Sequence, residues 1–162
     1  MTIATRVMPP QPLPREKLTG LSGKQTLEMI MNGDLPAPPF AATMLIDLAE
    51  VDEGRVVFTG QCDFSFLNPM GTVHGGWIAA ILDSAMGCAV HSTLHPGQIY
   101  MTTSMTINYV RPLLEDTGLV RCEATAVYVG ARMATSEGRL VDSKGRLIAH
   151  GSESCMIMEA RP

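Results

Sequence analysis

The sequence predicts an α+β fold in which a curved antiparallel sheet of six strands wraps around one long apolar helix. Residues 74–93 form a run that is apolar on nearly every helical face, and a helix without a polar face is buried. Strand-like runs lie on both sides of it, and the short connections favour antiparallel neighbours over parallel crossovers. A single sheet that curls around the helix buries the apolar surface of both.

The N-terminal part has two sections. Residues 1–23 are rich in proline and have no apolar period, so we expect a flexible, extended or disordered arm ahead of a single domain at 24–162. A short amphipathic helix follows at Gln25–Asn32 and is stopped by Gly33. The proline-rich stretch 35–39 then predicts a rigid extended linker.

The remaining chain alternates strand-like runs with turn residues. The six expected strands are residues 40–51, 55–64, 100–110, 118–129, 132–142 and 146–158. The turn Asp52-Glu53-Gly54 separates the first two, and the turn at 142–145 separates the last two. The long helix lies between the second and third strands, and Pro96-Gly97 follows its end.

Composition excludes several classes of function. The net charge of −4 gives no basic field for nucleic acid. The apolar run is too broken by glycines and polar residues for a membrane span, and no charged-then-apolar signal segment opens the chain, so a cytoplasmic location is expected. The four cysteines share no short spacing, which favours buried free thiols over a zinc site. We expect no metal and no redox cofactor.

Two features disturb the burial of the long helix. Gly75 and Gly76 leave approachable backbone N–H groups at its positive end. Asp83 places a carboxylate in the middle of the apolar run, which costs several kcal/mol unless the group is paired or used. The glycines could instead relieve crowding against the sheet, and Asp83 could pair with a backbone amide. An active-site helix explains both features together.

A longer motif carries a family resemblance. It reads Asn68-x5-His74-Gly75-Gly76-x6-Asp83 and opens an apolar helix between strand pairs. In this it resembles the hotdog-fold acyl-CoA thioesterases of the phenylacetate-pathway (PaaI-like) branch of the 4-hydroxybenzoyl-CoA thioesterase superfamily. Residues 109–112 and 145–151 are similar to strand signatures of that family, and the resemblance covers roughly 40–158.

The resemblance, together with the chemistry of thioester hydrolysis, implies roles for five residues. The Gly75 N–H is suited to polarise a thioester carbonyl, and Asp83 to act as general base or nucleophile. Asn68 could position water or the carbonyl, although it is equally suited to a turn. His74 would shape the helix start rather than act as a base. Thr102 would orient water, unless it is simply a strand residue.

A second set of residues is expected to contact coenzyme A. Guanidinium groups bind phosphates well, which makes Arg111, Arg132 and Arg146 candidates, with solvated surface charge as the alternative. By resemblance, the substrate-binding set is Tyr109, Arg111, Gly130, Ala131 and Arg132.

The expected function is hydrolysis of a small or medium acyl-CoA, aliphatic or aromatic, to free acid and coenzyme A. A thioesterase acting on acyl carrier protein and a non-catalytic acyl-CoA-binding module are the alternatives, and Asp83 argues against the second. Gly75 and Asp83 lie eight residues apart, roughly 12 Å along a helix, too far to act on one carbonyl. We therefore expect a homo-oligomer with sites shared between two chains, a dimer of dimers by resemblance, with acyl-CoA as partner and no nucleic acid or membrane.

Overall fold

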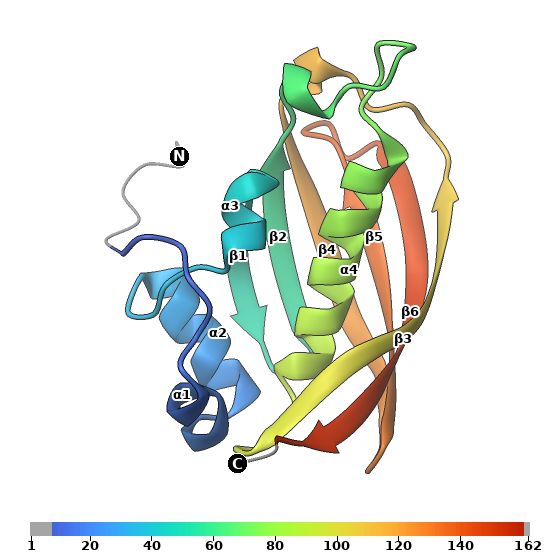
Figure 1. Ribbon diagram of the computed structural model, residues 1–162. Helices are drawn as coiled ribbons and strands as arrows, with labels where there is room; N and C mark the ends of the chain where they lie inside the picture. The colour runs from blue at the N-terminus through green and yellow to red at the C-terminus, as the bar shows by residue number, and fades with distance from the viewer. Residues whose placement is uncertain (1–7, 161–162) are drawn as a thin grey trace.

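The computed structural model describes residues 8–160, and these form one six-stranded antiparallel sheet around a helix (Figure 1). The strands are β1 (Ile46–Asp52), β2 (Arg55–Gln61), β3 (Gln98–Tyr109), β4 (Leu119–Val129), β5 (Met133–Val141) and β6 (Leu147–Glu159). Their order in the sheet is β1-β2-β4-β5-β6-β3. The predicted fold class is confirmed, because every neighbouring pair is antiparallel and the sheet curves around a single long helix.

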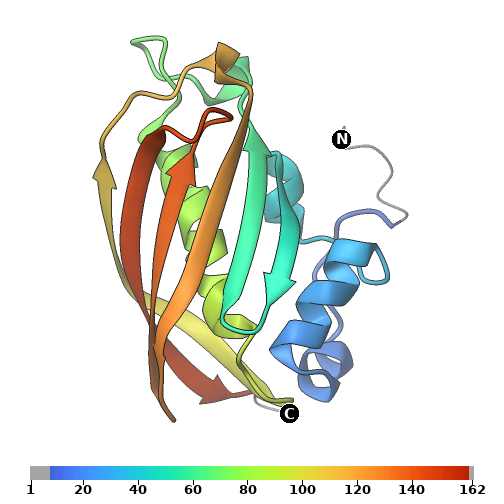
Figure 2. The same cartoon turned by 180° about the vertical axis from the view of Figure 1, so that it is seen from behind.

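That helix, α4 (Gly75–His91), crosses the concave face of the sheet and contacts β2 to β6. Seen from behind, the strands lie in front of it (Figure 2). Ile81, Leu82 and Met86 are fully buried in the main core, in agreement with the all-round apolar sequence. At about 1.5–3 kcal/mol per buried aliphatic side chain, this face is a major source of stability.

The C-terminal end of α4 is tied to the sheet and to the N-terminal helices. Ser92, which is buried, accepts a hydrogen bond from the Gly54 N–H (2.8 Å) and donates one to the Ala89 carbonyl. In α2 (Gly23–Asn32), a Cβ at Gly23 would lie 1.7 Å from the His91 carbonyl oxygen. Only glycine therefore allows this backbone-to-backbone contact, which fixes the start of α2 against the end of α4.

Two segments differ from the expectation. The predicted strand at 40–51 starts as a helix, α3 (Pro39–Thr43), because proline at the first helical turn has a favourable φ and needs no N–H acceptor. Leu45 then has φ 53°, a left-handed conformation, and the strand begins only at Ile46. The indole of Trp77 donates to the Met44 carbonyl (2.8 Å) and holds this turn on α4.

The N-terminal arm contains a helix that the sequence did not predict, α1 (Arg15–Gly20). Gln11 also donates a backbone hydrogen bond to the Ala37 carbonyl (3.2 Å), so part of the arm lies along the linker before α3. Residues 1–7 of the predicted arm lie outside the described residues.

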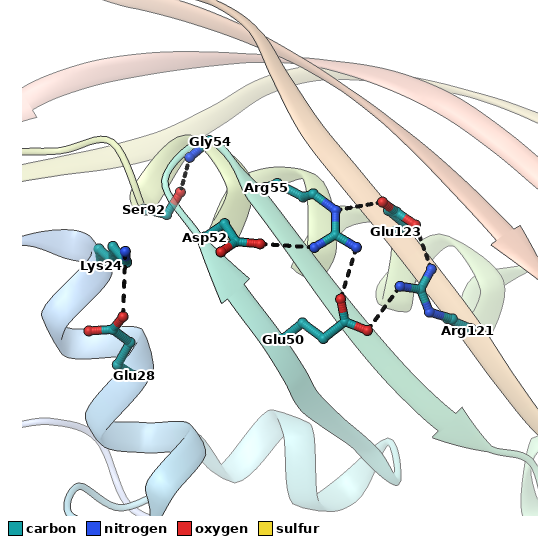
Figure 3. A network of polar contacts seen from close by, with 9 residues as sticks. All are labelled: Lys24, Glu28, Glu50, Asp52, Gly54, Arg55, Ser92, Arg121 and Glu123. Atoms are coloured by element: carbon teal, nitrogen blue, oxygen red, sulfur yellow. Dashed lines mark hydrogen bonds and ion pairs between the residues drawn. The ribbon is translucent and has the colours of Figure 1, made fainter.

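Charged side chains link β1, β2 and β4 (Figure 3). Arg55 contacts Glu50, Asp52 and Glu123. Arg121 contacts Glu50 and Glu123. The Arg121 guanidinium, followed by that of Arg55, lowers the pKa of both glutamates. Exposed pairs of this kind contribute little individually, so the network chiefly favours one register among the three strands.

Candidate active site

The start of α4 presents a backbone donor. His74 is the N-cap, and its Nδ1 accepts the Gly76 N–H (2.9 Å). Within residues 8–160 no acceptor engages the Gly75 N–H, which lies at the positive end of the helix dipole. The Tyr109 hydroxyl donates to the Gly75 carbonyl (3.2 Å), so the end of β3 lies against this donor. The arrangement is suited to hold a carbonyl oxygen that gains negative charge.

Asn68 closes the turn that leads into α4. Its Oδ1 accepts from the N–H groups of Met70 (2.9 Å) and Thr72 (3.3 Å), and its Nδ2 donates to the Thr72 hydroxyl (2.8 Å). Asn68 therefore has the turn role that the sequence left open. One N–H of the Asn68 amide is left over, because a primary amide carries two.

Asp83 lies two turns further along α4 and is half-buried. The hydroxyl of Thr102 on β3 is 3.2 Å from Asp83 Oδ1, so the structure brings these two predicted residues together. The same hydroxyl is 2.9 Å from Oε1 of Glu153 on β6. Sequence reasoning missed Glu153. The signal was its alternation with Gly151 and Cys155, which places all three on the buried face of β6.

Asp83 forms part of the wall of an apolar cavity of about 470 Å³. The cavity lies between α4 and the layer made by α2, the linker to α3 and β1. Its apolar lining includes Leu27, Ile30, Met31, Leu35, Phe40 and Leu48, and Tyr100 and Cys88 lie beside Asp83. Met8 of the N-terminal arm also lines it. A carboxylate at the wall of an apolar space of this size is typical of a small-molecule site.

The predicted coenzyme A contacts fall into two places. Tyr109 and Arg111 are both exposed at the end of β3. Tyr109 lies beside Gly75, and Arg111 Nη1 donates to the Leu147 carbonyl (3.0 Å). Gly130, Ala131 and Arg132 connect β4 to β5, and the Arg132 carbonyl accepts from Ile157, which pairs with Tyr100.

Tyr100 and Tyr109 are nine residues apart on β3, roughly 30 Å at strand rise. One chain therefore does not bring the two groups together. Arg146 is held by Asp142 (2.6 Å) in the β5–β6 turn.

Comparison with known proteins identifies the fold and the chemistry. Residues 70–149 match the Thioesterase superfamily, a stretch that contains Gly75, Asp83 and Thr102. The chain is a hotdog-fold thioesterase. A related sequence, the 1,4-dihydroxy-2-naphthoyl-CoA hydrolase of Listeria monocytogenes, is 22% identical over 106 residues, which are 65% of this chain and 85% of that protein.

Solved structures agree. A phenylacetic acid degradation-related protein of Ralstonia eutropha JMP134 is 29% identical, with 80% of this chain and 98% of that one covered and a TM-score of 0.74. The PaaI protein of E. coli is 20% identical, with 88% and 97% covered and a TM-score of 0.74, and supports the fold. The predicted function, an acyl-CoA thioesterase, is confirmed, and the acyl group is left open.

Two further findings concern the surroundings of this thioesterase. Among the described residues no group of His, Cys, Asp and Glu side chains gathers as metal ligands, and the absence of a cofactor stays a prediction. None of the described helices is both long enough and apolar enough to cross a membrane.

The contacts of Asn68 predict how its two roles separate. Asn68→Asp keeps the Oδ1 acceptor of the turn but cannot donate an N–H. We expect its melting temperature to stay within a few degrees of wild type, and its kcat to fall by about tenfold or more, as when a positioned donor is lost. Asn68→Ala, the control, should lose both stability and activity. Full kcat in Asn68→Asp would restrict Asn68 to the turn.

Proposed function

We propose that this thioesterase hydrolyses acyl-CoA esters whose acyl group is one ring or a medium-length chain, at a site assembled from two copies of the chain. The observation that carries the proposal is the position of Asp83, a carboxylate at the wall of the apolar cavity.

The cavity supports the size of the acyl group. Its volume of about 470 Å³ lies in the lower half of the range typical of small-molecule pockets. The lining is aliphatic and aromatic and includes methionines, which adapt to irregular shapes. An acyl group seated there would place its thioester beside Asp83, and the much larger, charged coenzyme A moiety would extend toward the surface.

The proposed chemistry divides the work between two groups. The Gly75 N–H donates to the carbonyl oxygen and stabilises the negative charge that develops there. Asp83 takes a proton from a water molecule, whose oxygen bonds to the carbonyl carbon. The C–S bond then breaks, and the departing sulfur takes up the proton held by Asp83. The products are the free acid and coenzyme A.

Both groups must reach one carbonyl within about 3 Å, and this supports the two-chain site. Gly75 and Asp83 are separated by roughly 12 Å along α4. Strand β3 lies at the edge of the sheet and is twelve residues long, with Met101 and Tyr109 exposed. An uncovered edge of this length is a pairing surface. Antiparallel pairing of two β3 strands about a two-fold axis would bring the start of one α4 toward the middle of the other.

The same pairing would join the two groups of coenzyme A contacts. Tyr109 and Arg111 lie at one end of β3, and Gly130 to Arg132 lie near the other end. In an antiparallel pair, the first group of one chain approaches the second group of its partner. Arg111 and Arg132 would then face the same nucleotide phosphates from different chains.

A second interface would make the assembly a dimer of dimers. Met101, Met156 and Met133 are neighbours across β3, β6 and β5, and all three are exposed on the outer face of the sheet. A row of exposed methionines is a feature of protein contact surfaces. We place the enzyme in the cytoplasm, which suits its four free thiols.

The alternatives have less support. A binding module without catalysis has no use for a half-buried carboxylate in its apolar wall. Acyl carrier proteins are acidic and favour a basic rim, whereas this chain has a net charge of −4.

The chemistry is tested with a panel of aliphatic and aromatic acyl-CoA esters, by measuring thiol release. We expect kcat/KM to be highest for one-ring and medium-length acyl groups. Asp83→Asn should lower kcat by about 10² or more, while its melting temperature holds or rises because a half-buried charge is removed. Ser84→Ala, which alters the neighbouring cavity residue, is the control. An Asp83→Asn enzyme with more than half the wild-type kcat would rule out this role.

The cavity is tested by filling it from α2. Ile30→Trp should leave the shortest acyl-CoA nearly unaffected and lower kcat/KM for the largest good substrate by about tenfold or more, because one or two displaced methylenes are worth 1–3 kcal/mol. Lys24→Trp changes the same helix outside the cavity lining and should leave the ranking unchanged. Equal losses for every acyl length would place the acyl group elsewhere.

The shared site is tested by complementation. Gly75 is the first residue of α4, a position that accepts proline, so Gly75→Pro removes the donor without breaking the helix. Gly75→Ala, whose Cβ meets Tyr109 at an ordinary 3.5 Å, is the control that keeps the N–H. Mixed dimers of Gly75→Pro and Asp83→Asn chains should regain one intact site of two. If mass spectrometry confirms mixed dimers but activity stays at the parental level, each site belongs to one chain.

A further inference from the structure

We propose that Glu153 is a positioning residue that stays a neutral carboxylic acid at neutral pH and, through Thr102, fixes the Asp83 carboxylate. The inference rests on the proposed role of Asp83 in the reaction. Glu153 does not line the cavity, and its proposed effect on the reaction passes through Thr102.

One hydroxyl proton is shared between two carboxyl groups. The Thr102 hydroxyl lies 3.2 Å from Asp83 Oδ1 and 2.9 Å from Glu153 Oε1. A hydroxyl carries one proton, and an ionised carboxylate only accepts hydrogen bonds. If both acids were ionised, one of these contacts would set an oxygen lone pair against a negative charge. With one acid protonated, both contacts become hydrogen bonds.

The surroundings assign the proton to Glu153. Glu153 is 2% exposed, whereas Asp83 is half-buried at the cavity wall. Glu153 Oε2 has no hydrogen-bond partner among the described residues, which costs less for the carbonyl oxygen of a neutral acid than for a carboxylate oxygen. The ion pairs found within residues 8–160 do not include Glu153.

The polar groups around Glu153 supply no positive charge. From α4 it meets Asp83 and Cys88, and from β3 it meets Tyr100 and Thr102. On its own strand Cys155 donates to Oε1 (3.0 Å). From β5 Ser136 lies opposite it in register, and the Ser136 hydroxyl also has no partner among the described residues.

These surroundings also fix the charges of the cluster. Burial, and then the nearby Asp83 charge, raise the pKa of Glu153, while its hydrogen bonds with Cys155 and Thr102 offset part of this rise. Burial raises the pKa of Cys88 to about 12 and that of Tyr100 well above its usual value. Cys88 and Tyr100 therefore add no negative charge to the cluster at neutral pH.

The result is a fixed chain of donors. Glu153 Oε1–H donates to Thr102 Oγ1, and Thr102 donates to Asp83 Oδ1. This orients the Asp83 carboxylate and leaves Oδ2 free for water at the thioester. No proton moves along the chain during turnover. If Glu153 ionises at high pH, the donor to Thr102 is lost and a second negative charge appears beside Asp83.

Glu153→Gln tests the neutral state, because an amide donates to Thr102 without any charge. At pH 7 its kcat should stay within about threefold of wild type, whereas Glu153→Leu, which offers no donor, should lose about tenfold or more, the scale of a lost hydrogen bond to a charged group. Wild-type kcat should fall at alkaline pH as Glu153 ionises, and Glu153→Gln should lack that fall. The proposal is overturned if Glu153→Gln is as inactive as Asp83→Asn. It is also overturned if the kcat of Glu153→Gln falls at alkaline pH as that of wild type does.

Two measurements do not depend on turnover, so they separate this proposal from the proposed function. Infrared spectra of the wild-type protein at pH 7 should show the carbonyl band of a protonated carboxyl, and Glu153→Gln should lack it. No such band, or a band that persists in Glu153→Gln, would place the proton elsewhere.

Stability gives the second readout. A buried acid with a raised pKa stabilises the fold fully below the unfolded-state pKa of glutamate, and this contribution is lost as pH rises through the folded pKa. The melting temperature of wild type should therefore fall more steeply between mildly acidic and alkaline pH than that of Glu153→Gln. Parallel curves would show that Glu153 has no raised pKa and would overturn the proposal.

Discussion

The structure depends on the covering of a helix that has no polar side. Since α4 exposes apolar side chains around its whole circumference, a single flat sheet cannot bury it, and the sheet must curve. The remaining side is closed by α2, α3 and the linker between them. This closure is less complete than the packing against the strands, and the apolar cavity lies there. The cavity and the strand-facing core therefore lie on different sides of the same helix, α4.

The polar groups that enter this apolar setting are few, and each is constrained. The free N–H at Gly75 comes from the unavoidable deficit of acceptors at a helix start. The carboxyl groups of Asp83 and Glu153 are joined through the hydroxyl of Thr102. Gly75 and Asp83 are separated by roughly 12 Å along α4, so in the proposed reaction the donor and the carboxylate of one chain would act on different carbonyls. The proposal of a site shared between two chains rests on this placement of both groups on one straight helix.

The sequence predicted the sheet and the long helix, because both follow from periodicity. It named Asp83 and Thr102 as separate site residues, and their hydrogen bond is a finding of the structure. It missed α3, where Pro39 starts a helix in a run that reads as a strand. Glu153 was also missed, since a glutamate in an alternating strand is identified as buried only when its neighbours in space are known. Asn68 shows the same limit, because its amide contacts are fixed by the shape of the turn.

The contact between Gly23 and the His91 carbonyl oxygen has a consequence for evolution of the acyl preference. Helix α2, which forms one wall of the cavity, contacts α4 through the two backbones, with no side chain between them. The separation of α2 from α4 at this end of the cavity therefore depends on the absence of a single methyl group at Gly23. A larger residue at position 23 would clash with the His91 carbonyl oxygen and force a shift between α2 and α4, although Gly23 does not line the cavity. In the proposed function, where the cavity holds the acyl group, such a shift would change the chain-length preference from a position outside the cavity lining.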